Sequence, residues 1–312
     1  MQTISPAPEI WATRLSQVAT YIGNTPLARL EKVQPNPRVK ILAKLEWQQM
    51  GASVKARPAF NILKEALLSG ALAPGQRLLD ASSGNTGIAY GAIGAALGIP
   101  VSLCLPENAS SERKINLRAL GVEIIYTSPF ELTDGAQQKA KEMYAQAPHR
   151  YFYADQYANV HNWQAHYFGT AEEIFAQTQG QITHFVAGLG TTGTFTGTSR
   201  RLRELNPNIR RIALHPDTPL HGLEGWKHLE TALVPKFYDP ALAHEHREVD
   251  TARAYALIRQ VARAEGWLLS PSSAANLAGA LEVAQTLDEG LVVTVFPDSA
   301  DKYSEVMKKL FA

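Results

Sequence analysis

The chain has 312 residues, of which 45% are hydrophobic, so it can form one or two domains with large cores. Lysine and arginine number 30 and aspartate and glutamate 29, which gives a formal net charge of +1. Balanced charge without a basic cluster argues against nucleic-acid binding. The single cysteine, Cys104, excludes an internal disulfide and a zinc site built from cysteines, and we expect no metal centre.

We expect no membrane span and no signal peptide. The N-terminus has no basic stretch followed by an apolar one, and the longest mostly apolar run, Ala92–Leu105, contains glycine and proline. These features predict a soluble, cytoplasmic protein. Cys104 lies in Pro100–Pro106, a run typical of a buried strand, so we interpret it as a core residue and not a reactive thiol.

The first half of the chain alternates stretches with strand and helix periodicity. In Pro58–Leu68, apolar residues recur with the spacing i, i+3, i+4, i+7 and i+8, which is typical of one face of a helix. Strands are expected at Val39–Leu45, Arg77–Asp80, Pro100–Leu105 and Val122–Tyr126, and helices at Pro58–Leu68, Thr86–Leu97, Ser110–Leu120 and Leu132–Ala147.

The second half repeats this alternation after a polar, irregular crossing at Asp155–Asn162. His215–His246 shows no periodicity and is interpreted as a functional loop or interface. The alternation predicts an α/β protein with parallel sheets, in which ligands bind beyond the carboxyl ends of the strands. Strands are expected at Ile182–Ala187, Ile209–Leu214 and Leu291–Phe296, and helices at Trp163–Gln177, Thr194–Leu205, Ala252–Ala264, Ser273–Thr286 and Asp301–Phe311.

Three loops rich in glycine or hydroxyl groups precede predicted helices: Ser53–Lys55, Ser82–Gly87 and Gly188–Thr194. Backbone N–H groups at a helix N-terminus favour an anion, and hydroxyl groups add further donors. Two such sites suit two anionic groups, for instance a phosphate and a carboxylate.

The third loop, GLGTTG, also fits the dinucleotide fingerprint G-x-G-x-x-G, and Asp217 follows Gly193 by 24 residues. Binding of NAD or FAD is therefore an alternative. The hydroxyl groups of Thr191, Thr192 and Thr194 favour a terminal phosphate monoester, because it offers more acceptors than a bridging pyrophosphate.

Further motifs occur in a fixed order along the chain. They are Ile22–Leu27, Lys44–Glu46, Ser53–Lys55 with Arg57, Ser82–Gly87, Pro106–Asn108 with Ser110–Arg113, Gly190–Thr194, Ser272–Ser273 and Pro297–Ser299. With these motifs, the chain resembles the fold-type II pyridoxal-phosphate (PLP) enzymes, and within them the cysteine synthase family. The resemblance runs from about residue 21 to 304, and the loop Gly190–Thr194 has the form typical of the cysteine synthase B branch.

The resemblance implies two parallel-sheet α/β domains with PLP in the cleft between them. A smaller, mobile domain at 41–157 would carry the PLP lysine and a carboxylate loop. A larger domain at 1–40 and 158–312 would carry the phosphate loop. The resemblance also implies a homodimer whose partners are an amino-acid substrate and a sulfur donor.

The resemblance also assigns roles to individual residues. Lys55 would form the Schiff base with PLP, a role that suits lysine because its pKa falls readily in surroundings that disfavour the ammonium. Asn85 would bond the 3′ oxygen of PLP, and Ser272 would face its pyridine nitrogen. The cofactor phosphate would be held by Gly190, Thr191, Thr192, Gly193 and Thr194, and the substrate carboxylate by Ser82, Ser83, Gly84, Thr86 and Gln156.

Structural interpretations stay open for several of these residues. Asn85 and Ser272 would then cap the helices that follow them, Gln156 would be a polar surface residue, and Lys55 a surface lysine near a helix start. The chain also departs from the family pattern near Lys55, with Gln49–Ala52 in place of Asn-Pro-x-Gly and Ala56 in place of aspartate.

A serine that faces the pyridine nitrogen would not keep this nitrogen protonated, as an aspartate would. The cofactor then withdraws fewer electrons, which disfavours a long-lived carbanion and favours elimination of a β leaving group. The expected reaction is β-replacement on O-acetyl-L-serine by sulfide or a small thiol, giving L-cysteine and acetate. The alternatives are β-elimination, another donor or nucleophile, an NAD(P)-dependent oxidoreductase that uses GLGTTG, and a catalytically degenerate partner protein.

Lys227 is a candidate for selecting the leaving group. It lies in His215–His246, a segment that leaves the carboxyl end of a predicted strand and so is expected to reach the binding region. A cation there would favour a donor with an anionic leaving group, such as O-phosphoserine. The alternative is a solvated loop lysine.

Overall fold

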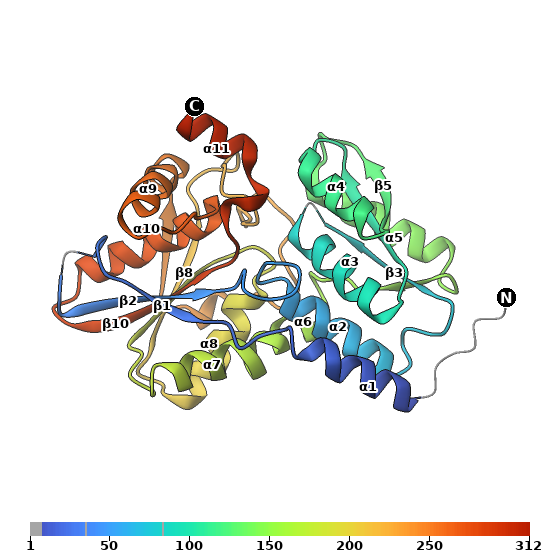
Figure 1. Cartoon of the computed structure of the whole chain (residues 1–312), viewed down its shortest axis with the longest axis horizontal. Coiled ribbons are helices and arrows are strands. Elements are labelled where there is room, and N and C mark those ends of the chain that lie inside the picture. Colours follow the sequence, from blue (N-terminus) through green and yellow to red (C-terminus); the bar gives the residue numbers. More distant parts are fainter. Residues whose placement is uncertain (1–7, 35, 83) are drawn as a thin grey trace. The chain divides into compact units, whose positions relative to one another are not determined.

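The computed structural model describes residues 8–34, 36–82 and 84–312. The chain forms two compact units (Figure 1). The first contains the described residues up to Gly23, together with Gln49–Gly51 and Lys55–Asn162. The second contains Asn24–Gln48, Ala52–Val54 and Trp163–Ala312.

The first unit is built on a parallel sheet with the strand order β5–β4–β3–β6. Side chains alternate between the two faces of a strand. Leu78 and Leu103 therefore enter a core with α2 and α3, whereas Leu79 and Cys104 enter a second core with α5. The elements are α1 (Pro8–Ala19), α2 (Ala56–Leu68), β3 (Arg77–Ala81), α3 (Asn85–Leu97), β4 (Val101–Pro106), α4 (Ser111–Ala119), β5 (Glu123–Thr127), α5 (Leu132–Gln146) and β6 (Tyr151–Tyr153).

Cys104 is confirmed as a core residue, since none of it is exposed. Burial raises the pKa of its thiol to about 12, so the reactive thiolate is disfavoured at neutral pH.

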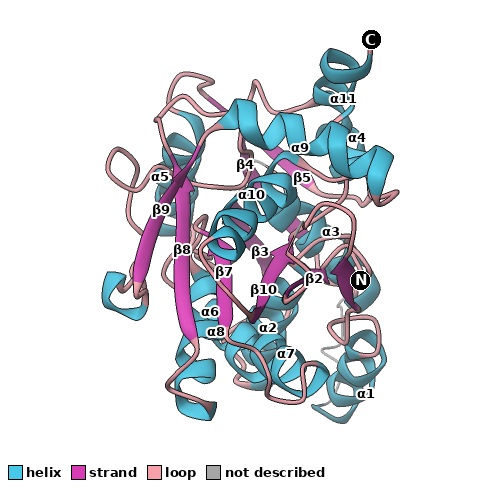
Figure 2. Ribbon diagram, turned by 90° about the vertical axis from the view of Figure 1, so that its left-hand side faces the viewer, coloured by secondary structure: helices cyan, strands magenta, loops and turns pink. Residues whose placement is uncertain are grey.

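The second unit is built on a six-stranded sheet with the order β1–β2–β10–β7–β8–β9, in which only the pair β1–β2 is antiparallel. Helices α9 and α10 cover one face, and α7 and α8 cover the other (Figure 1). The alternation of side chains is visible in β10, where Val292 enters the core formed with α9 and α10, and Val293 enters the core formed with α7 and α8. Figure 2 shows α10 beside strands β7 and β10.

The remaining bounds complete the second unit and the connection to it. They are β1 (Leu27–Leu30), β2 (Val39–Leu45), α6 (Val160–Ala165), the π-helix η1 (His166–Thr170), α7 (Ala171–Gln177), β7 (His184–Gly188), α8 (Gly193–Leu205), β8 (Arg210–Pro216), the short 3₁₀ helix η2 (Pro240–Leu242), β9 (Glu245–Val249), α9 (Thr251–Ala264), α10 (Pro271–Gln285), β10 (Gly290–Phe296), the 3₁₀ helix η3 (Ala300–Lys302) and α11 (Ser304–Phe311). Among the described residues, no helix is both long and apolar enough to cross a bilayer.

The structure differs from the sequence prediction in several elements. Helix α1 and strands β1, β6 and β9 were not expected. β6 has only three residues, and β9 exposes alternate polar side chains at a sheet edge, so neither gives a clear periodic signal. The helix expected over Trp163–Gln177 was wrong in its bounds and regularity, because a π-helical segment separates α6 from α7.

The two units divide the chain differently from the predicted domain ranges 41–157 and 1–40 with 158–312. Strand β2 belongs to the second unit because it pairs with β10 along its whole length. Helix α1 belongs to the first unit because it packs on α2 and α3. The predicted ranges remain a prediction about which part of the chain moves.

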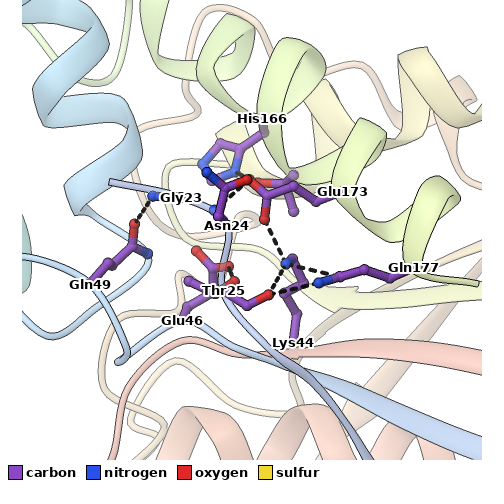
Figure 3. A network of polar contacts seen from close by, with 10 residues as sticks. Gly23, Asn24, Thr25, Lys44, Glu46, Gln49, His166, Glu173 and Gln177 are labelled. Carbon is purple, nitrogen blue, oxygen red and sulfur yellow. Dashed lines mark hydrogen bonds and ion pairs between the residues drawn. The ribbon is translucent and has the colours of Figure 1, made fainter. Parts of the chain in front are cut away.

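A buried ion pair joins β2 to α7 in the second unit (Figure 3). Lys44 at the end of β2 is fully buried, and its Nζ lies 2.6 Å from a carboxylate oxygen of Glu173 on α7. The same ammonium donates to the carbonyl of Thr25 at 2.5 Å and to the side chain of Gln177 at 3.1 Å. The Thr25 hydroxyl donates to Glu46 at 2.7 Å. The motifs Ile22–Leu27 and Lys44–Glu46 therefore meet here and fix the chain before β1.

We expect Lys44→Met to lower the free energy of unfolding by about 3–5 kcal/mol, because it leaves the Glu173 carboxylate without this cation in a largely buried place. Urea unfolding followed by circular dichroism measures the change. Lys40→Met is the matched control, since Lys40 is exposed on the same strand, and its effect should stay within about 0.5 kcal/mol. Equal losses in the two variants would contradict a special role of the buried pair.

Candidate active site

The loop predicted to bind the substrate carboxylate follows the carboxyl end of β3 in the first unit. Ser82 is buried, and its Oγ accepts hydrogen bonds from the backbone N–H groups of Gly84 at 3.1 Å and Gly87 at 3.0 Å. Gly84 is the N-cap residue of α3, and Asn85 is its first residue, partly exposed. Asn85 is therefore not the helix cap. Ser83 lies outside the described residues.

Gln156 lies beside this loop, although 70 residues separate it from Thr86. The Thr86 hydroxyl donates to the Gln156 side-chain oxygen at 2.7 Å, and the Gln156 amide donates to the carbonyl of Ala81 at 2.6 Å. Gln156 is only 3% exposed. The interpretation of Gln156 as a polar surface residue was therefore wrong.

Lys55 is the N-cap residue of α2 and is half-buried. The turn before it is tight, because Gly51 and Ala52 both have positive φ angles, 77° and 47°. Ala56, where relatives usually carry aspartate, is fully buried in the first turn of α2. A carboxylate there would need a partner for its buried charge, and alanine avoids that need.

The loop predicted to bind the phosphate lies in the second unit, between the carboxyl end of β7 and the N-terminus of α8. Thr192 adopts a left-handed conformation with φ 66° directly before α8. A side chain at position 190 is excluded, because a Cβ on Gly190 would lie 2.1 Å from the carbonyl oxygen of Gly225. The loop therefore brings Gly190, Thr191, Thr192, Gly193 and Thr194 together around one helix N-terminus.

His166 contacts this loop and was missed in the sequence analysis. Its ring is 1% exposed, with Nδ1 at 2.9 Å from the Thr170 hydroxyl and Nε2 at 3.3 Å from the Thr194 hydroxyl. The ring lies on the π-helix η1, and π-helical segments often occur at functional sites. The sequence of Trp163–Gln177 predicted one regular helix, so neither the π-helical segment nor the role of His166 was recognised.

The segment that follows β8 packs on the loop at 188–194. The backbone N–H of Lys227 donates to the carbonyl of Leu189 at 2.8 Å. Trp226 is 8% exposed and fills the space beside Gly188, where a Cβ would meet its ring at 2.0 Å. The backbone of the Lys227 segment is therefore tied to the loop at 190–194.

Ser272 lies in the first turn of α10 and is 4% exposed. The N-cap role belongs to Ser270, whose Oγ accepts from the Ser273 backbone N–H at 3.2 Å. The capping interpretation of Ser272 was therefore wrong. Its Oγ lies 3.3 Å from that of Ser270.

The described residues of the loop at 190–194 fit a phosphate group. The Oγ1 of Thr192 is buried and has no hydrogen-bond partner within the described ranges 8–34, 36–82 and 84–312. A buried hydroxyl without a partner is costly, so an absent ligand is a physical explanation for it. The N-terminus of the 13-residue helix α8 adds outward N–H groups and a favourable dipole for an anion.

Comparison with known proteins identifies the class. The family described as pyridoxal-phosphate dependent enzyme matches residues 18–298. The chain therefore belongs to this family, and its cofactor is pyridoxal 5′-phosphate. The match confirms the cofactor expected from the sequence and disfavours the reading of GLGTTG as a dinucleotide site.

The relatives define the kind of enzyme within the family. Cysteine synthase of Aquifex aeolicus (strain VF5) is 44% identical over 293 residues, which cover 92% of this chain and 90% of that protein. Cysteine synthase B of Escherichia coli (strain K12) is 36% identical over 291 residues, covering 93% and 94%. The crystal structure of cysteine synthase (OASS) from Entamoeba histolytica matches with a TM-score of 0.87 at 31% identity, covering 99% of this chain and 94% of that one. The chain is thus an enzyme of the cysteine synthase type with the fold-type II architecture.

We expect Thr192→Val to weaken PLP affinity about 10- to 100-fold, because a hydrogen bond to a charged group contributes about 1.5–3 kcal/mol. Equilibrium dialysis of PLP measures the affinity. Thr198→Val is the matched control: its buried hydroxyl also lacks a partner among the described residues, but it lies further along α8. Unchanged affinity in Thr192→Val, or the same loss in both variants, would contradict the assignment.

Proposed function

We propose that the protein catalyses β-replacement on an activated L-serine, O-acetyl-L-serine, with sulfide or a small thiol as the nucleophile. The products are L-cysteine and acetate. The observation that carries the proposal is the 44% identity to a cysteine synthase over 92% of this chain. The predicted motifs also supply a lysine, a carboxylate loop and a phosphate loop in one chain.

Lys55 performs the proton transfers in this proposal. PLP, when bound, withdraws electrons from the substrate and so makes its α proton more acidic. Lys55 would hold PLP covalently through its Nζ, and its release would make that nitrogen available for proton transfer with the substrate. The freed Nζ then removes the α proton as a general base and returns it after the nucleophile has added to the β carbon.

Two loops orient the reactants. Gly190, Thr191, Thr192, Gly193 and Thr194 bind the phosphate of the cofactor. Ser82, Ser83, Gly84, Thr86 and Gln156 bind the substrate carboxylate. Movement of the predicted domain 41–157 excludes water during turnover, which protects the reaction from hydrolysis.

Asn85 and Ser272 tune the cofactor in this proposal. Asn85 would bond the 3′ oxygen of PLP, and the Ser272 hydroxyl would face the pyridine nitrogen. Because Ser270 supplies the cap of α10, the Ser272 hydroxyl is not engaged as that cap. A neutral hydroxyl at this place favours loss of the β leaving group over a long-lived negative charge on the α carbon.

We also propose that the enzyme is a homodimer in the cytoplasm, which rests on the resemblance to the family. Light scattering coupled to gel filtration tests the dimer. The departures around Lys55, including Ala56 and Gln49–Ala52, keep β-elimination, another donor or nucleophile, and a degenerate partner protein as outcomes of the assays below.

The absorbance spectrum of the purified protein tests the proposal directly. We expect a visible band from lysine-bound PLP that disappears on borohydride reduction. We then expect O-acetyl-L-serine to change the band, and added sulfide to restore it while cysteine forms. A protein that binds PLP but leaves O-acetyl-L-serine unchanged would overturn the proposed reaction.

We expect Lys55→Ala to keep the fold and still bind PLP weakly through the loop at 190–194, but to lose turnover, because Lys55 supplies both the covalent link and the proton transfers. Circular dichroism, dialysis of PLP and a cysteine assay measure the three properties. Lys64→Ala is the control, since Lys64 is partly exposed on the same helix. Substantial β-replacement by the pure Lys55→Ala variant would contradict the role of Lys55.

We propose that Lys227 selects between O-acetylserine and O-phosphoserine, because its segment is tied to the loop at 190–194 through Leu189. We expect Lys227→Ala to lower kcat/KM for O-phosphoserine about 10-fold more than for O-acetylserine, as loss of one charge-assisted contact would do. Steady-state rates with both donors measure this ratio. An equal loss for both donors, or no loss, removes the hypothesis.

A further inference from the structure

Asp80 is a buried carboxylate that the proposed reaction does not use. It lies near the end of β3, directly before the loop at 82–87, and is 1% exposed. Its Oδ1 accepts from the backbone N–H of Ala81 at 2.8 Å, and its Oδ2 accepts from the backbone N–H of Gln156 at 3.3 Å. One side chain therefore ties two segments that lie 76 residues apart in the sequence.

The hydrogen bond between the Asp80 side chain and the Gln156 N–H extends the pairing of two neighbouring strands. β3 and β6 pair in parallel from Arg77↔Tyr151 to Leu79↔Tyr153, and the Ala154 N–H donates to the Leu79 carbonyl at 2.9 Å. Beyond that point the Asp80 carboxylate takes the place of a backbone acceptor for Gln156. The carboxyl ends of β3 and β6 are thus held together where regular pairing has ended.

The contact with Asp80 also affects the orientation of the Gln156 side chain. The Gln156 side-chain amide bridges the Ala81 carbonyl and the Thr86 hydroxyl, and the backbone carbonyl of Gln156 accepts from the Asn162 side chain at 2.6 Å. The two side-chain contacts hold the Gln156 amide between β3 and the start of α3. Displacing the backbone N–H of Gln156 from Asp80 would therefore displace the two residues proposed to meet the substrate carboxylate.

We propose that Asp80 is a positioning residue that sets the geometry of the substrate-carboxylate site by holding the Gln156 backbone against the loop at 82–87. The inference rests on the proposed function for the identity of the substrate, but not for the binding of an amino-acid carboxylate. Asp80 itself touches no substrate in this scheme.

The electrostatic surroundings of Asp80 support a role other than stabilising the fold. Burial, opposed in part by the backbone N–H groups and reinforced by the charge of Asp155, raises the pKa of Asp80 to about 8. Burial and the charge of Asp80 likewise raise the pKa of the tyrosines around it, which are Tyr90 on α3, Tyr153 on β6 and Tyr157 after it. Burying an ionisable group in such surroundings costs more free energy than burying an apolar residue of the same volume, so the hydrogen-bond geometry of Asp80, and not a contribution to stability, is the better explanation for it.

The test is the variant Asp80→Asn in the holoenzyme. An asparagine side chain has one acceptor oxygen, so its NH₂ group must face one of the two backbone N–H groups. We expect KM for O-acetyl-L-serine to rise about 10-fold, with kcat changed less than about 3-fold. The dissociation constant of unactivated L-serine, followed by the visible spectrum, should rise by a similar factor. PLP affinity, measured by dialysis, should stay unchanged because the loop at 190–194 is not altered.

Asp239→Asn is the matched control. Asp239 accepts from the backbone N–H of Ala241 at 3.0 Å in an exposed turn of the second unit. We expect it to change neither KM nor the binding of L-serine. If Asp80→Asn does not fold, Asp80→Ser offers a smaller neutral side chain that also lacks the second acceptor, and the same rise in KM is expected.

Two results would overturn the inference. A fall in kcat with unchanged KM and unchanged L-serine binding would indicate a purely structural role, since it reflects a smaller active fraction. Unchanged kinetics in both Asp80 variants would remove it as well. If the wild-type protein does not turn over O-acetyl-L-serine, the proposed function fails, whereas L-serine binding in the variants still decides the role of Asp80.

Discussion

Parallel strand pairing positions the residues of the candidate active site, because it brings the carboxyl ends of neighbouring strands to the same edge of each sheet. In the first unit, β3 leads into the loop at 82–87 and β6 leads to Gln156. In the second unit, β7 leads into the loop at 190–194, and its neighbour β8 leads to the segment that packs on that loop. Backbone hydrogen bonds between strands thereby place residues far apart in the sequence close together.

Each unit also buries an ionisable side chain close in sequence to its functional loop or motif. Lys44 in the second unit is paired with Glu173, and Asp80 in the first unit is held by two backbone N–H groups. The net contribution of a buried ion pair to stability is small, because taking a charge out of water offsets most of the gain from pairing it, although removing only one partner is costly. The directional contacts of such buried groups restrict the chain to one arrangement, which an apolar core cannot do as sharply.

Much of the fold could be predicted from the sequence, since its signals are local. The predicted strand Val39–Leu45 has the observed bounds, and the loops at 82–87 and 190–194 lie at strand-to-helix junctions as expected. The contacts of Asp80, Lys44 and His166 could not be predicted in the same way. They join residues far apart in the chain, and no periodicity or spacing records which side chain a buried polar group will meet.

The site residues were named from motifs, and the structure adds what each motif leaves unstated. A serine before a helix can be a cap or a ligand, and the contact of Ser270 with the Ser273 N–H excludes the capping role for Ser272. A glutamine in a polar crossing has no periodicity to reveal burial, yet Gln156 is almost completely enclosed. In both residues the deciding information is a hydrogen-bond partner and not a residue type.

The π-helix η1 lets one helical stretch direct two side chains to separate contacts. Its wider turn sets His166 against Thr194 while Glu173, one element later, faces Lys44. A π-helical turn holds about one residue more than an α-helical turn, because its hydrogen bonds run from residue i to i+5 instead of i to i+4. If the same residues formed a regular α-helix, the directions of His166 and Glu173 would differ by about 100° from those observed, since an α-helix advances by that angle per residue. The π-helical turn therefore allows one continuous helical stretch to make both contacts.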